Sequence, residues 1–268
     1  IAGIGWIGTS FYFIALDLSL RKREKMKEGV MGTAWEVHGG GGHHVEKFTV
    51  APSELPGDLV WFKWEAYLTW LTGFVLLVVQ FYLDAGAWMI DPAVMALEPW
   101  QAVAFSVASL AVGWFVYDGL CRSPIGRNTT LLTVIGFLWI LAAAYFYTTV
   151  FSGRAALIHV GAFIGTIMAA NVFRVIIPNQ KRVTEALLAG QTPDPKYGEI
   201  GKQRSVHNTY LTLPVLVTMV SGHYPMLSAH PQAWLIVAFI IVGGACLRHA
   251  LVSIEVDEPF SRYRWTLP

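Results

Sequence analysis

Long runs of apolar residues recur along the chain, and short polar segments separate them. A helix needs about 20 mostly apolar residues to cross the roughly 30 Å hydrocarbon core of a bilayer. Such runs must be helical, because an open sheet edge in lipid leaves backbone groups without partners. We therefore expect an all-α polytopic membrane protein in contact with the lipid bilayer. The pattern predicts seven visible spans, at residues 1–20, 62–83, 100–120, 129–151, 155–178, 206–222 and 232–253.

The longest polar segment, residues 21–63, follows the first span. Its stretches TAWEVH and HHVEKFTV alternate apolar and polar residues, and GGGG joins them. Two alternating stretches around a glycine turn are typical of a β-hairpin. We expect residues 29–60 to form a small cytoplasmic hairpin that caps the bundle, within a single transmembrane domain covering residues 1–268.

The positive charges are unevenly distributed along this pattern. Apart from Arg154, every Lys and Arg lies at residues 21–63, 121–128, 174–205 or from 248 onward. These segments fall on one side of the membrane if the N-terminus is outside, and Lys and Arg accumulate on the cytoplasmic side. The charges thus predict an outside N-terminus. We also expect the first helix to begin before Ile1, and an eighth helix to follow the final TLP.

Composition excludes several other classes of protein. The chain is 54% hydrophobic and 14% charged, whereas soluble domains have about a quarter of their residues charged. Its net charge of +1 argues against a nucleic-acid partner, which needs a broad basic face. Two cysteines are too few for a disulfide framework. The sequence also lacks the motifs GxSxG, HExxH and the P-loop.

The histidines within or beside the predicted spans are candidates for holding haem. A b-type haem in a helical bundle takes an axial imidazole from each side. Depth along the spans groups the histidines into an outer and an inner pair, which predicts one or two haems. The alternative is that each histidine hydrogen-bonds a neighbouring helix. The outer pair is His159 with His223, the inner pair is His207 with His249, and Arg154 and Arg248 are candidates for the haem propionates.

Three other polar residues lie near the predicted inner membrane boundary. Asp17 and Arg174 either form a structural ion pair or contact a substrate. Asn171, one turn from Arg174, either hydrogen-bonds a polar ligand or bridges helices.

Three regions resemble the membrane domain of the bacterial membrane-bound urate oxidases, also called urate hydroxylases or cytochrome c urate oxidases. They are IAGIGWIGTSFYFIALDLSL, then AWEVHGGG with HVEKF and LPGDLVWFKWEAYLTWLTGF, and finally SVHNTYLTLPVLVTMVSGHYP. The resemblance implies an eight-helix domain in the bacterial inner membrane, followed by a cytochrome c domain with its own haem. The CxxCH motif of that cytochrome domain is absent from this sequence, and Gly42 and His43 replace an aromatic pair of the family.

The resemblance also implies a reaction and its partners. Urate is oxidised to 5-hydroxyisourate, and its electrons pass through haem to cytochrome c and the respiratory chain. Two alternatives remain: a non-catalytic haem-bearing electron-transfer subunit of a respiratory assembly, and a transporter for a small anion. A site for the planar urate anion needs cations, hydrogen-bonding groups and an aromatic face. The hairpin and nearby helix ends offer Trp35, Glu36, His38, His44, Glu46, Lys47, Arg174 and Asn208.

Overall fold

The computed structural model of the protein describes residues 1–49 and 58–266. The predicted cap at 29–60 and the predicted opening of an eighth span therefore lie partly outside the described residues. The long helices are α1 (Ala2–Ser19), α2 (Trp64–Leu77), α4 (Pro99–Arg122), α5 (Thr129–Val150), α6 (Gly153–Asn171), α7 (Ile177–Leu188), α8 (Pro195–Val220) and α10 (Ala233–Glu255). The short helices are α3 (Ala85–Trp88), α9 (Pro225–Ser228) and α11 (Phe260–Tyr263). The π-helical turns are η1 (Val78–Tyr82) and η3 (Val172–Ile176). The 3₁₀ turns are η2 (Pro124–Arg127), η4 (Ser221–His223) and η5 (Arg264–Thr266).

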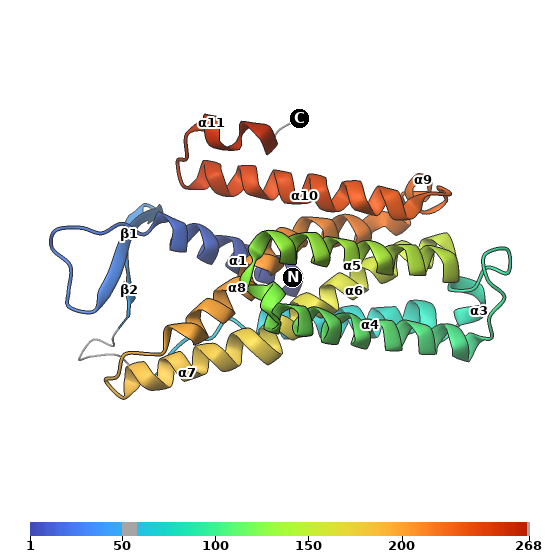
Figure 1. Ribbon diagram of the computed structural model, residues 1–268, viewed down its shortest axis with the longest axis horizontal. Coiled ribbons are helices and arrows are strands. Elements are labelled where there is room, and N and C mark those ends of the chain that lie inside the picture. Colours follow the sequence, from blue (N-terminus) through green and yellow to red (C-terminus); the bar gives the residue numbers. More distant parts are fainter. Residues whose placement is uncertain (50–57, 267–268) are drawn as a thin grey trace.

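Helices α4, α5, α6 and α10 run lengthwise through the bundle (Figure 1). Helix α6 is the most buried of them and packs against α2, α4, α5 and α8. Helices α3 and α9 lie at one end, and the β-hairpin and the α7–α8 turn lie at the opposite end (Figure 1). We call the latter the basic end, because it carries the Lys- and Arg-rich segments predicted to be cytoplasmic.

In the described part of the chain, five helical segments are long and apolar enough to cross a membrane. They are Trp64–Tyr82, Pro99–Arg122, Thr129–Val150, Gly153–Leu188 and Ala233–Glu255. The two other predicted spans are helical, as α1 and α8, but do not meet the same criterion. Helix α1 has 18 residues with several Gly, Ser and Thr and one Asp, and α8 begins with a charged stretch.

Two predicted boundaries were wrong, both at the basic end. The helix predicted to end at Pro178 continues through η3 and α7 to Leu188, and α8 begins at Pro195 instead of 206. An apolar run predicts only the part of a helix that contacts lipid. A helix that continues into water with polar residues extends past the end of that run. Pro178 is accommodated in the first turn of α7, directly after the wide π-helical turn η3.

The hairpin is confirmed. Strands β1 (Val30–His38) and β2 (Gly41–Phe48) pair antiparallel. Gly39 and Gly40 connect them with φ values of 62° and 82°, a region that glycine enters at little cost. The hairpin reaches α1 through two side-chain contacts: Tyr12 donates to the Glu36 carboxylate at 2.6 Å, and Lys47 pairs with Asp17 at 2.6 Å.

The end of the bundle opposite the hairpin contains a tight contact that predicts a mutational effect. A Cβ on Gly153 would collide with the backbone carbonyl of Ser228, whereas a Cβ on Gly136 would meet no atom within 4 Å. We expect Gly153→Ala to lower the free energy of unfolding by about 1–3 kcal/mol, the usual range for overpacking. The Gly136→Ala control should be neutral or stabilising, because alanine favours helix. Unfolding in detergent followed by circular dichroism measures both, and equal behaviour of the variants would contradict the contact.

Candidate functional site

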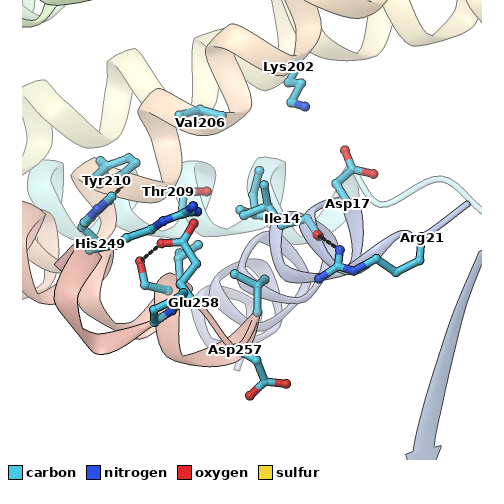
Figure 2. A pocket seen from close by; sticks show the side chains of 16 residues that line it. Ile14, Asp17, Arg21, Lys202, Val206, Thr209, Tyr210, His249, Asp257 and Glu258 are labelled. Carbon is cyan, nitrogen blue, oxygen red and sulfur yellow. Dashed lines mark hydrogen bonds between the residues drawn. The ribbon is translucent and has the colours of Figure 1, made fainter. Parts of the chain in front are cut away.

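A pocket of about 600 Å³ lies at the basic end between α1, α8 and α10 (Figure 2). We call it the basic-end pocket. Tyr210 and His249 lie side by side at its wall, and the Tyr210 hydroxyl and His249 Nδ1 share a hydrogen bond of 2.9 Å. The cations lining the pocket are Arg21, Lys202 and Arg262, the acidic residues are Asp17, Asp257 and Glu258, and the other polar side chains are Thr209, Tyr210, His249 and Ser253.

Arg248 is not among the residues that line this pocket. It lies one turn of α10 before Val252, which does line it, and is completely buried, with 0% exposure. Its Nε, NH1 and NH2 atoms all lack a hydrogen-bond partner among the described residues. Its Cζ lies 3.7 Å from the ring centroid of Phe11, and NH1 lies 3.7 Å from the Glu255 carboxylate. Arg248 is therefore a buried cation whose hydrogen-bonding capacity is unused.

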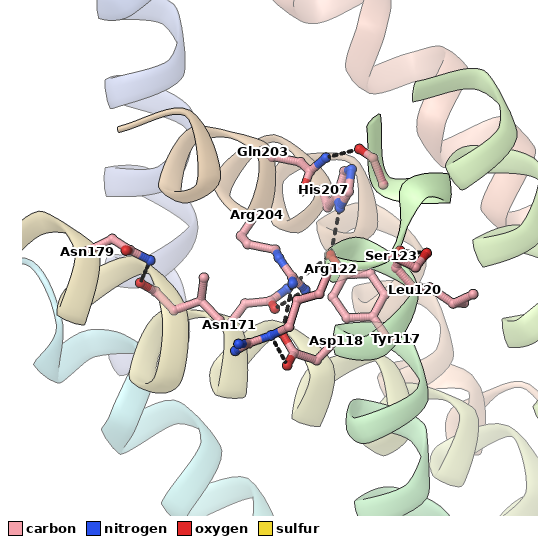
Figure 3. A network of polar contacts seen from close by, with 12 residues as sticks. Tyr117, Asp118, Leu120, Arg122, Ser123, Asn171, Asn179, Gln203, Arg204 and His207 are labelled. Atoms are coloured by element: carbon pink, nitrogen blue, oxygen red, sulfur yellow. Dashed lines mark hydrogen bonds and ion pairs between the residues drawn. The ribbon is translucent and has the colours of Figure 1, made fainter. Parts of the chain in front are cut away.

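A second polar cluster lies where α4, α6 and α8 meet (Figure 3). Arg204 is 2% exposed; it donates to Asp118 at 2.8 Å and to Asn171 at 3.3 Å. Asn171 donates in turn to the Tyr117 hydroxyl at 3.3 Å and to Asn208 at 3.1 Å. We call this cluster the polar network; its members are Tyr117, Asp118, Arg122, Asn171, Arg204, His207 and Asn208.

Sequence reasoning missed four members of the polar network: Tyr117, Asp118, Arg122 and Arg204. Asp118 carried a usable signal, because it lies inside the predicted third span and an ionisable residue there is by default a functional candidate. Of the alternatives for Asn171, the structure shows it bridging helices through Asn208 and Tyr117.

Of the four candidate haem ligands, His159 is the most deeply buried, at 0% exposure. Its Nδ1 lies 2.7 Å from the Ala155 carbonyl oxygen. Because a carbonyl only accepts, Nδ1 carries the proton and Nε2 keeps its lone pair. That Nε2 is buried and has no hydrogen-bond partner among the residues that the structure describes, within a cage formed by Phe81, Tyr147 and Phe151.

The other candidate ligands lie on different faces. His223 is exposed in η4, which packs against α6. The Tyr117 hydroxyl and His207 Nδ1 share a hydrogen bond of 2.6 Å, which turns His207 toward α4. His249 instead contacts Tyr210 on another face of α8. In residues 1–49 and 58–266, no three His, Cys, Asp or Glu side chains converge as a metal site.

The two arginines predicted for haem propionates also lie far apart along the chain and differ in burial. Arg154 is exposed next to α3, with its Cζ 5.3 Å from the ring centroid of Trp88. Arg248 alone is enclosed by protein.

The residues predicted to bind urate occupy two separate places. On the hairpin, the rings of Trp35 and His44 lie 4.6 Å apart, and the His38 carbonyl contacts the His43 ring at 3.3 Å. Glu36, Glu46 and Lys47 bind Tyr12, Lys27 and Asp17, respectively.

Arg174 and Asn208 belong to the helical bundle instead. The Arg174 Cζ lies 5.9 Å from the ring centroid of Trp114, and Asn208 belongs to the polar network. Asp17 thus pairs with Lys47 and not with Arg174. Across the described part of the chain, no hydrogen bond or ion pair joins the hairpin to Arg174 or Asn208.

Comparison with known proteins gives one match. A family model described as urate oxidase N-terminal covers residues 1–267. No curated protein and no solved structure matches the chain.

Proposed function

Because the chain belongs to the urate oxidase N-terminal family, we propose that it forms the membrane part of an enzyme that oxidises urate to 5-hydroxyisourate. The family match confirms the resemblance noted from sequence and is the observation that carries the proposal. In this reaction urate and water give 5-hydroxyisourate, two protons and two electrons. The electrons require an acceptor, and we propose haem followed by cytochrome c and the respiratory chain.

The proposed setting is the bacterial inner membrane. Five helices are apolar and long enough to span it, and we assign α1 and α8 as two further spans. The basic end then faces the cytoplasm, because Lys and Arg concentrate on that side. This places the N-terminus outside.

The basic-end pocket is the proposed site of the substrate. Its volume of about 600 Å³ is within the usual range of small-molecule sites, about 300–1,000 Å³. Arg21, Lys202 and Arg262 line it together with Asp17, Asp257 and Glu258. The pocket therefore offers individual cationic donors for the oxygens of an anion such as urate, without a net positive charge. Tyr210 adds a hydroxyl and a ring face for a planar ligand.

The proposed acceptor within the chain is a b-type haem, and the geometry of one histidine supports it. The unpartnered, buried Nε2 of His159 has the lone pair that an axial ligand needs, and the proposal keeps His223, His207 and His249 as the other ligands. Bound haem would supply a one-electron acceptor. The chain's own part is to orient the His159 ring through Ala155 and to exclude water around it.

Visible spectroscopy of the detergent-purified protein tests the proposal. Under anaerobic conditions, we expect added urate to reduce a b-type haem and 5-hydroxyisourate to appear in the product analysis. Dithionite provides the reference for full reduction. A haem that only dithionite reduces would refute urate oxidation by this chain and favour an electron-transfer subunit. Urate oxidation without any haem would refute the proposed acceptor.

A further inference from the structure

We infer that Arg248 is the anion-recognition residue of the basic-end pocket, and that its guanidinium binds the delocalised negative charge of a small planar organic acid. The identity of that acid as urate rests on the proposed function. The inference itself rests on the burial, missing partners and position of Arg248.

Burial without partners is the first observation. Arg248 is 0% exposed, and none of its three guanidinium nitrogens has a hydrogen-bond partner in the described chain. A buried cation is costly unless it is paired and hydrogen-bonded. Glu255 lies 3.7 Å away, beyond hydrogen-bonding distance, and its side chain is 42% exposed. Arg248 thus has Glu255 as an ion-pair neighbour but no described acceptor for its N–H donors. An anion that penetrates one layer below the pocket lining would supply those acceptors.

Position is the second observation. Arg248 shares a face of α10 with Val252 and Val256, which line the pocket, because residues four apart stack on one side of a helix. On α1, Phe11 shares a face with Ile14 and Leu18, which also line it. The Phe11–Arg248 contact therefore lies one helical turn deeper in the bundle than Ile14 and Val252, which line the pocket. At 1.5 Å per residue, it lies about 10 Å from the end of α10 at Glu255.

The chemistry of this layer suits a planar anion. A guanidinium stacked on an aromatic ring still presents several N–H donors at its edge, in a fork that matches two neighbouring acceptors. Urate offers such adjacent oxygen and nitrogen acceptors on a flat ring. The three cations and three carboxylates that line the pocket balance in charge, so the anion would be held by the Arg248 donors one layer below the lining, which would bind and orient it.

A haem propionate would offer the same anionic chemistry, and the experiment distinguishes the two sources. Arg248→Met removes the charge at similar length, and Arg248→Lys keeps the charge but loses the fork. Arg127→Met is the matched control, because Arg127 is exposed at the basic end and does not line the pocket. Equilibrium dialysis with labelled urate is performed anaerobically on the whole protein after reduction with dithionite, so that urate is bound and not oxidised, and haem content per chain is measured in parallel.

If urate is the anion, Arg248→Met raises the Kd for urate by about 10- to 100-fold, as expected for lost charged hydrogen bonds. Arg248→Lys, which retains the charge, should weaken binding less and serves as the variant of choice if Arg248→Met fails to fold. Haem content stays unchanged in both. Loss of haem with unchanged urate affinity would assign Arg248 to a propionate and overturn the urate site.

The outcomes also separate this inference from the proposed function. If the normal protein binds urate through Arg248 without oxidising it, the inference holds and the proposed function fails. If urate is oxidised and both Arg248 variants bind it normally, the inference fails and the proposed function holds. Absence of urate binding by the normal protein would overturn both.

Discussion

Arg204→Leu is expected to lower the free energy of unfolding by about 3–5 kcal/mol, the usual cost of removing one partner of a buried ion pair. Arg204 is 2% exposed and bonds to Asp118 and Asn171 in the polar network. Its loss leaves the Asp118 carboxylate near the protein interior with only Arg122 as a charged partner. Denaturant unfolding in detergent, followed by circular dichroism, measures the change.

Two further variants make this prediction specific. Arg204→Leu combined with Asp118→Asn removes both charges and should recover part of the lost stability, because no uncompensated carboxylate remains. Arg122→Leu should cost less than about 1 kcal/mol, since the Arg122 side chain is 68% exposed and its ion pair is screened by water. A double variant as unstable as the sum of the single variants would show that the ion pair is not the source of the effect.

Under the proposal that His159 is an axial ligand, His159→Phe is expected to abolish binding of the proposed haem, and with it the reduction of that haem by urate. Phenylalanine keeps an aromatic ring within the cage of Phe81, Tyr147 and Phe151 but removes the Nε2 lone pair. Haem per chain is measured by the pyridine haemochrome assay. His43→Phe is the control, because His43 is exposed on the hairpin and its ring contacts the His38 carbonyl there.

The opposite result for His159 is equally informative. If the Nε2 atom ligates nothing, it is a buried polar atom without a partner, and its removal should stabilise the fold by about 1–3 kcal/mol. Unchanged haem content together with raised stability would then refute His159 as a ligand. Replacing His223, His207 and His249 in turn by alanine would identify the second axial ligand through the same assay.

The fold was predictable where its causes are local. The hairpin follows from alternating residues around Gly39 and Gly40, whose positive φ values glycine adopts readily. Long apolar runs likewise revealed the long helices other than α7, which is polar. The ends of α7 and α8 at the basic end were not predictable from apolarity, because Leu188 and Pro195 lie in polar helical turns beyond the apolar runs.

The candidate site was less predictable, because it depends on which helix faces meet. Arg248 could be proposed as a partner for a haem propionate from its place beside His249, but its contact with Phe11 is a tertiary feature. Asn208 was grouped with the hairpin by its position along the chain. The structure instead directs its side chain toward Asn171 and the Met168 carbonyl.

The unbroken helical segment Gly153–Leu188 also affects how the protein can be imaged. Its 36 residues, at 1.5 Å each, extend about 54 Å, compared with the roughly 30 Å hydrocarbon core of a bilayer. Much of α7, together with the start of α8 and the hairpin, therefore projects from a detergent micelle at one end of the bundle. The opposite end carries the short helices α3 and α9 (Figure 1). This asymmetry gives a small particle a built-in landmark for orientation in electron cryomicroscopy.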